Sequence, residues 1–258
     1  MFGRFIGQFL DNESSFGRLM TRCGIIIGAN LMFVVFSLPL ITMGPALTAL
    51  YHVMLKTLRG DGDLNPFTQF WAGFKSNFKQ SLIYWIIFLL VAVVGIIDLK
   101  FCGQFDGGIL KFFKYALLVV ALIVITVTVY MMPVMAAFSD TIPHLMRNAL
   151  FFISKNPVRM IIILFFNVFP LYLTYTDVQF QPLYAFIWAF FGFGAVAMLT
   201  STLLLKDFSL YLPTVDSFGN ILTEEEVEEL RRTGQLAAPE EMKDSGKAAL
   251  DDMKKIGM

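Results

Sequence analysis

The stretch of sequence that decides the fold runs from Leu38 to Gly62 and reads LPLITMGPALTALYHVMLKTLRGDG. Pro39, Gly44 and Pro45 lie within seven positions of one another in it. A proline lacks an amide donor and disfavours helix in the residue before it, so we expect residues 38–44 to be non-helical. Pro45 suits the first position of a new helix. The stretch therefore ends one hydrophobic span, reverses the chain and begins the next.

The chain around this break is far more apolar than a soluble domain. It is 57% hydrophobic and 16% charged, whereas soluble domains are about 25% charged. Uncharged stretches long enough for membrane helices recur along it. The expected spans are residues 23–38, 45–58, 81–97, 115–132, 160–176 and 178–205. The sequence predicts an all-α fold, a polytopic transmembrane helical bundle with a broken Pro/Gly helix pair and a short helical cytoplasmic tail.

Composition divides the chain into three parts. Residues 1–22 are expected to form an amphipathic arm lying on the membrane interface, with a partner-docking arm as the alternative. Residues 23–205 form the transmembrane helical domain. Residues 206–258 carry 12 acidic and 7 basic groups and are expected to form an acidic, partly disordered cytoplasmic tail, in which Thr223 and Glu226 start a short helix as a capping box. The alternative for the tail is a contact with a basic cytoplasmic partner.

The charge of the loops predicts the number of crossings. Residues 45–58 would rise only about 21 Å as a helix, which is short for a span. With six crossings, 17 basic residues lie inside and 3 outside, and with five crossings the split is 14 against 6. The positive-inside rule therefore favours six crossings of the cell membrane with both termini cytoplasmic. Residues 98–114 are then a short, flexible outer loop.

An aromatic stripe follows the reversal. Asn65 is expected to cap a helix that begins at Pro66. The aromatic residues of this helix recur at helical spacing and are Phe67, Phe70, Trp71, Phe74 and Phe78. Such a face either docks a partner or packs at the membrane interface, where Lys75 and Lys79 can extend beside it.

The residues of the break also carry a family resemblance. They are Leu38, Pro39, Thr42, Gly44, Thr48, Ala49, Leu50, Tyr51, Lys56, Arg59 and Gly60, followed by the Phe-rich run FWAGFKSNFKQ. Over most of residues 10–210 the chain resembles the YesL family of small bacterial integral membrane proteins, whose function is unknown. Members are often encoded beside carbohydrate uptake systems and glycan-degrading enzymes, so the resemblance implies an accessory role in sugar utilisation. It implies no mechanism.

Few residues of the spans can carry chemistry. His52 is the one ionisable side chain expected inside them, where it either titrates in a cavity at the break or is a neutral group hydrogen-bonded between helices. Thr42, His52 and Asn167 could line a polar cavity, and helix packing is the alternative for them. The sequence lacks HExxH and CxxC metal motifs, a GxxxxGK[ST] phosphate loop and a basic stripe. We therefore expect no metal, cofactor, nucleotide or nucleic acid.

These features predict a non-enzymatic membrane protein. The leading hypothesis is an accessory or assembly partner of a carbohydrate uptake system, with a sugar ABC transporter permease or another membrane protein as partner. The rival is a facilitative transporter or permease component for a neutral solute, because transporters place broken helices at their binding sites. A carrier needs a polar cavity near Thr42, His52 and Asn167, whereas an accessory needs only an exposed patch. A lipid-modifying enzyme is a weaker third class.

Overall fold

The chain is built from helices, as the sequence predicts. The computed structural model describes residues 15–59, 65–104, 108–208 and 211, and within them it has no strand. The elements are α2 (Ser15–Ser37), η1 (Leu40–Thr42), α3 (Met43–Arg59), α4 (Pro66–Gly103), α5 (Gly108–Ala137), α6 (Ile142–Lys155), α7 (Pro157–Thr176), α8 (Gln181–Ile187), η2 (Trp188–Gly192) and α9 (Phe193–Phe208). In this part of the chain, five helices are long and apolar enough to cross a membrane. The all-α, multi-pass fold class is thus confirmed.

The break begins where proline predicts it, but the expectation that residues 38–44 are non-helical is wrong for residues 40–44. Helix α2 ends at Ser37, and α3 begins at Met43 after the short 3₁₀ turn η1. The new helix therefore starts two residues before Pro45, which makes Pro45 its third residue. The Thr42 hydroxyl donates to the carbonyl oxygens of Phe36 at 2.7 Å and Pro39 at 2.9 Å. The first bond satisfies the Phe36 carbonyl, which the end of α2 would leave without a helical partner.

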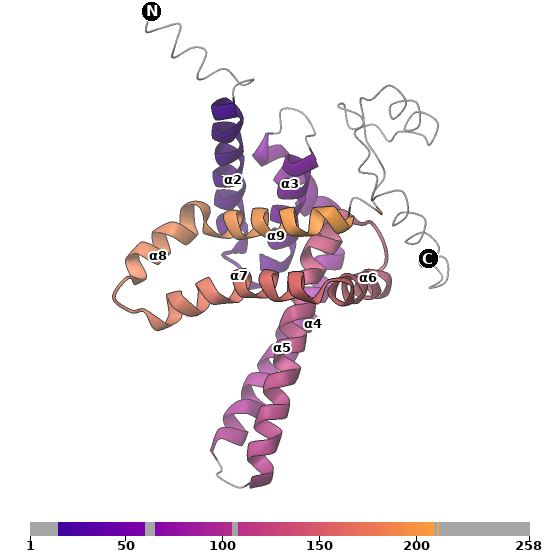
Figure 1. Cartoon of the computed structure of the whole chain (residues 1–258), viewed down its shortest axis with the longest axis vertical. Coiled ribbons are helices and arrows are strands. Elements are labelled where there is room, and N and C mark those ends of the chain that lie inside the picture. Colours follow the sequence, from indigo (N-terminus) through magenta and orange to yellow (C-terminus); the bar gives the residue numbers. More distant parts are fainter. Residues whose placement is uncertain (1–14, 60–64, 105–107, 209–210, 212–258) are drawn as a thin grey trace, which may run out of the picture.

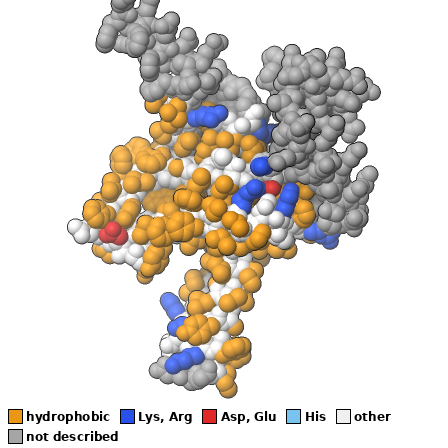
Figure 2. All heavy atoms as spheres, in the orientation of Figure 1, with side chains coloured by type: hydrophobic (Ala, Val, Ile, Leu, Met, Phe, Trp, Pro, Cys, Tyr) orange, Lys and Arg blue, Asp and Glu red, His pale blue; other side chains and the backbone are white. Residues whose placement is uncertain are grey.

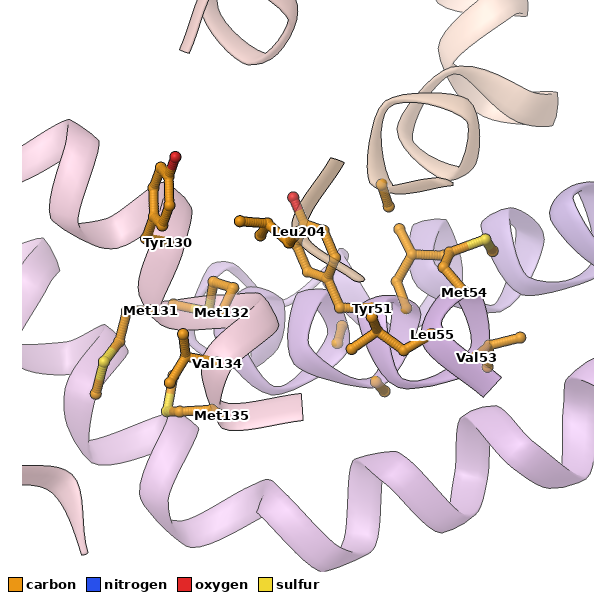
Figure 3. Close-up of a cluster of buried hydrophobic side chains, with 14 of the residues drawn as sticks. Tyr51, Val53, Met54, Leu55, Tyr130, Met131, Met132, Val134, Met135 and Leu204 are labelled. Carbon is orange, nitrogen blue, oxygen red and sulfur yellow. The ribbon is translucent and has the colours of Figure 1, made fainter. Parts of the chain in front are cut away.

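Helix α3 lies at the centre of the fold. It contacts α2, α4, α5 and α9, and 11 of its 17 residues are buried. Figure 3 shows Tyr51, Met54 and Leu55 of α3 beside Met132 of α5 and Leu204 of α9. At 1.5 Å per residue α3 is about 25 Å long, which is short for a span. The neighbouring helices shield this short segment. Whether α3 makes a sixth crossing stays a prediction.

The expected outer loop at residues 98–114 is wrong, because most of this segment is helical. Helix α4 continues to Gly103 and α5 begins at Gly108. Asp98, Lys100 and Lys114 stand on these helices, with Lys100 in the last turn of α4, where a cation is favoured by the helix dipole. Figure 1 shows the resulting α4–α5 hairpin extending well beyond the other helices. Charged side chains on an exposed helix tip need no loop to reach water.

Residues 140–159 contain a helix that the sequence analysis did not assign. Helix α6 buries Leu145, Asn148, Ala149 and Phe152 on one face. It ends at Lys155, and α7 begins at Pro157, so Asn156 alone separates the two helices. In Figure 1, α7 and the arm formed by α8, η2 and α9 run across the direction of α4 and α5. Figure 2 shows many hydrophobic side chains on the visible face of the α7–α9 part and of the α4–α5 hairpin, with Lys and Arg side chains towards the tip of the hairpin.

The predicted terminal parts fall largely outside the described residues. Residues 1–14 of the interfacial arm and residues 212–258 of the tail lie outside them, together with the capping box at Thr223. Residues 15–22 belong to α2 and continue directly into the first span. This span helix therefore has 23 described residues, more than residues 23–38 alone would give.

A buried asparagine joins α2 to the last membrane arm. Asn30 is fully buried, and its side-chain amide donates to the carbonyl oxygens of Trp188 at 3.1 Å and Ala189 at 2.8 Å. The Gly194 amide donates to Asn30 Oδ1 at 2.8 Å. The first two bonds hold the π-helical segment η2 against α2, and the third joins α2 to the first turn of α9.

Replacing Asn30 with alanine is expected to lower the free energy of unfolding by about 2 kcal/mol, because buried backbone groups would lose their partners. The measurement is thermal or denaturant unfolding in detergent. Asn77→Ala is the matched control, since the Asn77 amide bonds only within its own helix, to Gly73 and Ser76. Equal destabilisation by the two variants would show that the Asn30 bridge has no special role.

Candidate functional site

The three residues proposed for a polar cavity lie apart in the structure. Thr42 donates its hydroxyl to carbonyls of the break. The Asn167 amide on α7 donates to the carbonyl of Ile163 at 2.9 Å and to the hydroxyl of Thr200 at 3.0 Å. His52 lines a pocket to which neither Thr42 nor Asn167 contributes. The side-chain donors of Thr42 and Asn167 are thus engaged inside the protein.

The aromatic stripe of α4 is divided between core and surface. The predicted cap is confirmed, because Asn65 Oδ1 accepts from the amide of Phe67 at 3.0 Å. Phe70 and Phe74 are buried, with the Phe36 ring of α2 5.7 and 5.0 Å from their centroids. The following residues of the stripe differ in exposure: Phe67 is 50% exposed, Trp71 is 43% exposed and Phe78 is half-buried. Phe67 and Trp71 are therefore the members of the stripe that can contact a partner.

A pocket lies beside the exposed part of this stripe. It is formed by the last turns of α3, the first half of α4 and the segment that leaves α5, and its volume is about 990 Å³. Its charged lining is mostly basic: Lys56 and Arg59 come from α3, and Lys75 and Lys79 come from α4. Close contact between α3 and α4 brings the two basic pairs together, since the Gly73 position lies directly against His52. A Cβ atom on residue 73 would lie 2.9 Å from that imidazole.

The acidic side chain of the pocket contacts residues close to it in the sequence. Among the described residues, Asp140 is the carboxylate that lines the pocket. Its Oδ1 accepts from the Thr141 amide at 2.6 Å and lies 3.1 Å from Nδ1 of His144. The Thr141 amide, and to a lesser extent His144, lower the pKa of Asp140, so it is ionised at neutral pH. Within the described part of the chain, none of the ion pairs joins Asp140 to a lysine of the pocket.

The pocket lysines differ in their contacts and exposure. Lys56 donates to the Gln69 side chain at 3.0 Å. Lys75 lies 5.2 Å from the centre of the Trp71 ring, a cation–π contact. Lys75 and Lys79 are exposed, and Lys56 is half-buried. The arrangement places several cationic donors around one space and can hold an anion.

A second cluster of charges was missed by the sequence analysis. Asp207 of α9 is only 5% exposed and pairs with Arg159 of α7. Lys155 Nζ lies 3.7 Å from Asp207 Oδ1, and the Asn156 amide donates to the same oxygen at 3.3 Å. The sequence analysis assigned Asp207 to the solvated tail, yet it is the buried acceptor that joins α6, α7 and α9. The one sequence signal is an acidic residue that follows a long uncharged span after a single lysine, Lys206.

Comparisons with known proteins find similarity to a family and to a relative, and neither has an assigned activity. The family described as "Protein of unknown function, DUF624" matches residues 26–99. This segment holds all of α3 and the four basic residues of the pocket.

A curated relative matches a longer part of the chain. The uncharacterized protein YteU of Bacillus subtilis (strain 168) is 24% identical over 135 residues, which cover 50% of this chain and 60% of YteU. No solved structure matches the chain. The finer resemblance to the YesL family stays a prediction.

Proposed function

We propose that this protein is a non-enzymatic membrane protein that acts as an accessory or assembly partner of another membrane protein. The observation that carries the proposal is the exposed pair Phe67 and Trp71 at the start of α4. Aromatic side chains of this size supply most of the binding energy at many protein interfaces. Buried Phe70 and Phe74 hold the helix against α2 and fix the exposed pair in place.

The rival carrier hypothesis has less support. A carrier of a neutral solute needs polar groups that face a shared path. Thr42 and Asn167 instead make hydrogen bonds to groups of the protein itself, and the pocket at His52 is lined by neither. This distribution favours an accessory over a carrier.

The identity of the partner is proposed from the resemblance to the YesL family. Genes of that family are often found beside carbohydrate uptake systems, so we propose a sugar ABC transporter permease as the client. The DUF624 and YteU matches carry no activity from which a substrate could be taken.

Affinity purification in mild detergent tests the proposal. The intact protein is expected to recover a sugar permease or its ATPase, identified by mass spectrometry. A Phe67→Ala, Trp71→Ala double variant is expected to recover at least about tenfold less of this partner. Loss of an aromatic side chain that is buried in the complex reduces affinity by that factor or more. The Phe112→Ala, Phe113→Ala variant is the control, since these rings are 71% and 54% exposed on α5 near the far tip of the hairpin.

Two outcomes would contradict the proposal. Recovery of the folded protein without a transporter component argues against an accessory role, and solute flux in proteoliposomes would then support the carrier. Equal loss in both double variants would show that the start of α4 is not the contact.

A further inference from the structure

We propose that the pocket between α3, α4 and the end of α5 binds a phosphate-bearing anionic group, carried either by a membrane lipid or by a soluble compound. This proposal is independent of the accessory role, because it rests on the basic lining of the pocket and not on Phe67 or on any protein partner.

The charge of the lining selects for an anion. Lys56, Arg59, Lys75 and Lys79 reach the pocket from two helices, and Asp140 is the carboxylate opposite them in the described part of the chain. Asp140 is engaged with the Thr141 amide and His144. Lysine and arginine side chains that converge on one space are typical of phosphate sites, where they donate charge-assisted hydrogen bonds.

The walls of the pocket suit a group with both polar and apolar parts. Met135 and Ala136 of α5 and Phe74 and Phe78 of α4 provide apolar lining beside the lysines. The volume of about 990 Å³ is at the upper end of the range for small-molecule sites. It exceeds what a phosphate ion alone would fill, so there is room for the alcohol or glycerol part of a phosphate ester.

The location of the pocket fits the level of lipid headgroups. It lies where the apolar helix α5 ends at Ala137 and where α3 reaches its basic last turn at Lys56 and Arg59. Basic pockets between membrane helices at this level bind the headgroups of anionic lipids. Trp71, 43% exposed beside Lys75, has the amphipathic ring that is enriched at the membrane interface.

The test measures binding to the purified, full-length protein. Phosphatidylglycerol is titrated in detergent and followed by native mass spectrometry, with zwitterionic phosphatidylcholine as the reference lipid. Glycerol 3-phosphate and inorganic phosphate are titrated by calorimetry. Binding of phosphatidylglycerol alone identifies a lipid headgroup as the source, and binding of the soluble phosphates identifies a soluble ester.

A matched pair of variants shows whether the pocket is responsible. Lys56→Gln, Lys75→Gln, Lys79→Gln is expected to weaken binding about 100-fold, because each lysine near an anionic surface contributes roughly a fivefold factor. Lys100→Gln, Lys111→Gln, Lys114→Gln removes the same charge from the far tip of the α4–α5 hairpin and is expected to change binding less than about twofold. If the triple pocket variant loses its thermal unfolding transition, Lys79→Gln alone is expected to weaken binding about fivefold.

The proposal is overturned if the intact protein binds neither phosphatidylglycerol nor the soluble phosphates above the level of phosphatidylcholine. It is also overturned if the pocket and tip variants lose binding equally, because the effect would then reflect net charge. The Lys56→Gln, Lys75→Gln, Lys79→Gln variant keeps both Phe67 and Trp71. The accessory proposal is tested by recovery of a transporter component and this one by binding of an anion, so their failures are separate results.

Discussion

Arg159→Leu is expected to lower the free energy of unfolding by about 3 kcal/mol, because it removes a partner of a buried carboxylate. Asp207 is 5% exposed. Its carboxylate contacts the side chains of Arg159, Lys155 and Asn156 at the junction of α6 and α7. Lys155 stays in place but lies 3.7 Å away, so it replaces the lost contact only in part. The measurement is denaturant unfolding of the purified protein in detergent micelles.

A double-mutant cycle separates the ion pair from simple loss of packing. Asp207→Leu is expected to lower the free energy of unfolding less than Arg159→Leu does. The reason is that Arg159 and Lys155 are partly exposed and can turn towards water. The double variant is expected to be less destabilised than the sum of the two, because neither charge is then left alone. Arg22→Leu, at an exposed position on α2, is the control and is expected to change stability by less than about 0.5 kcal/mol. Additive effects in the cycle would contradict the assigned pairing.

Local chemistry made the break predictable. Pro39, Gly44 and Pro45 act on their own backbone and on the residue before them, so the end of α2 follows from sequence alone. The Asn65 cap is confirmed for the same reason. The start of α3 differs by two residues, because Met43 and Gly44 can take helical geometry once the 3₁₀ turn has redirected the chain.

Charge was a poor guide to where helices end. Residues 98–114 contain several charged residues and glycines, which the sequence analysis read as a loop. The side chains of Asp98 and Lys100 instead belong to helix α4, which continues to Gly103. The length of a span is set by hydrophobic thickness, but the length of a helix is set by backbone hydrogen bonding, and nothing in residues 98–103 interrupts it.

The candidate site depended on contacts between distant residues. Helical spacing correctly placed the aromatic residues of α4 on related faces, but it could not tell that Phe70 and Phe74 would be covered by Phe36 while Trp71 stayed exposed. The basic pocket likewise needs α3 to pack against α4 through Gly73, and a single sequence does not show that contact.

Gly44→Ala is expected to destabilise the protein by about 2 to 3 kcal/mol, the range for overpacking a tight core. A Cβ atom on residue 44 would lie 2.5 Å from Cβ and 2.6 Å from Cγ of Trp85. Trp85 cannot move aside without loss, because it is 7% exposed and its indole Nε1 donates to the carbonyl of Leu40 at 2.8 Å. The added methyl group therefore disrupts the packing of Trp85 of α4 against the break.

Gly95→Ala on α4 makes the same chemical change where no atom lies within 4 Å of the added carbon. It is expected to leave stability unchanged or raise it by up to about 1 kcal/mol, because alanine favours helix over glycine. Thermal unfolding of both variants in one detergent gives the comparison. Similar unfolding temperatures for the two variants would mean that Trp85 does not pack against Gly44 in the folded protein. This result would contradict the close approach of α3 and α4 at the break.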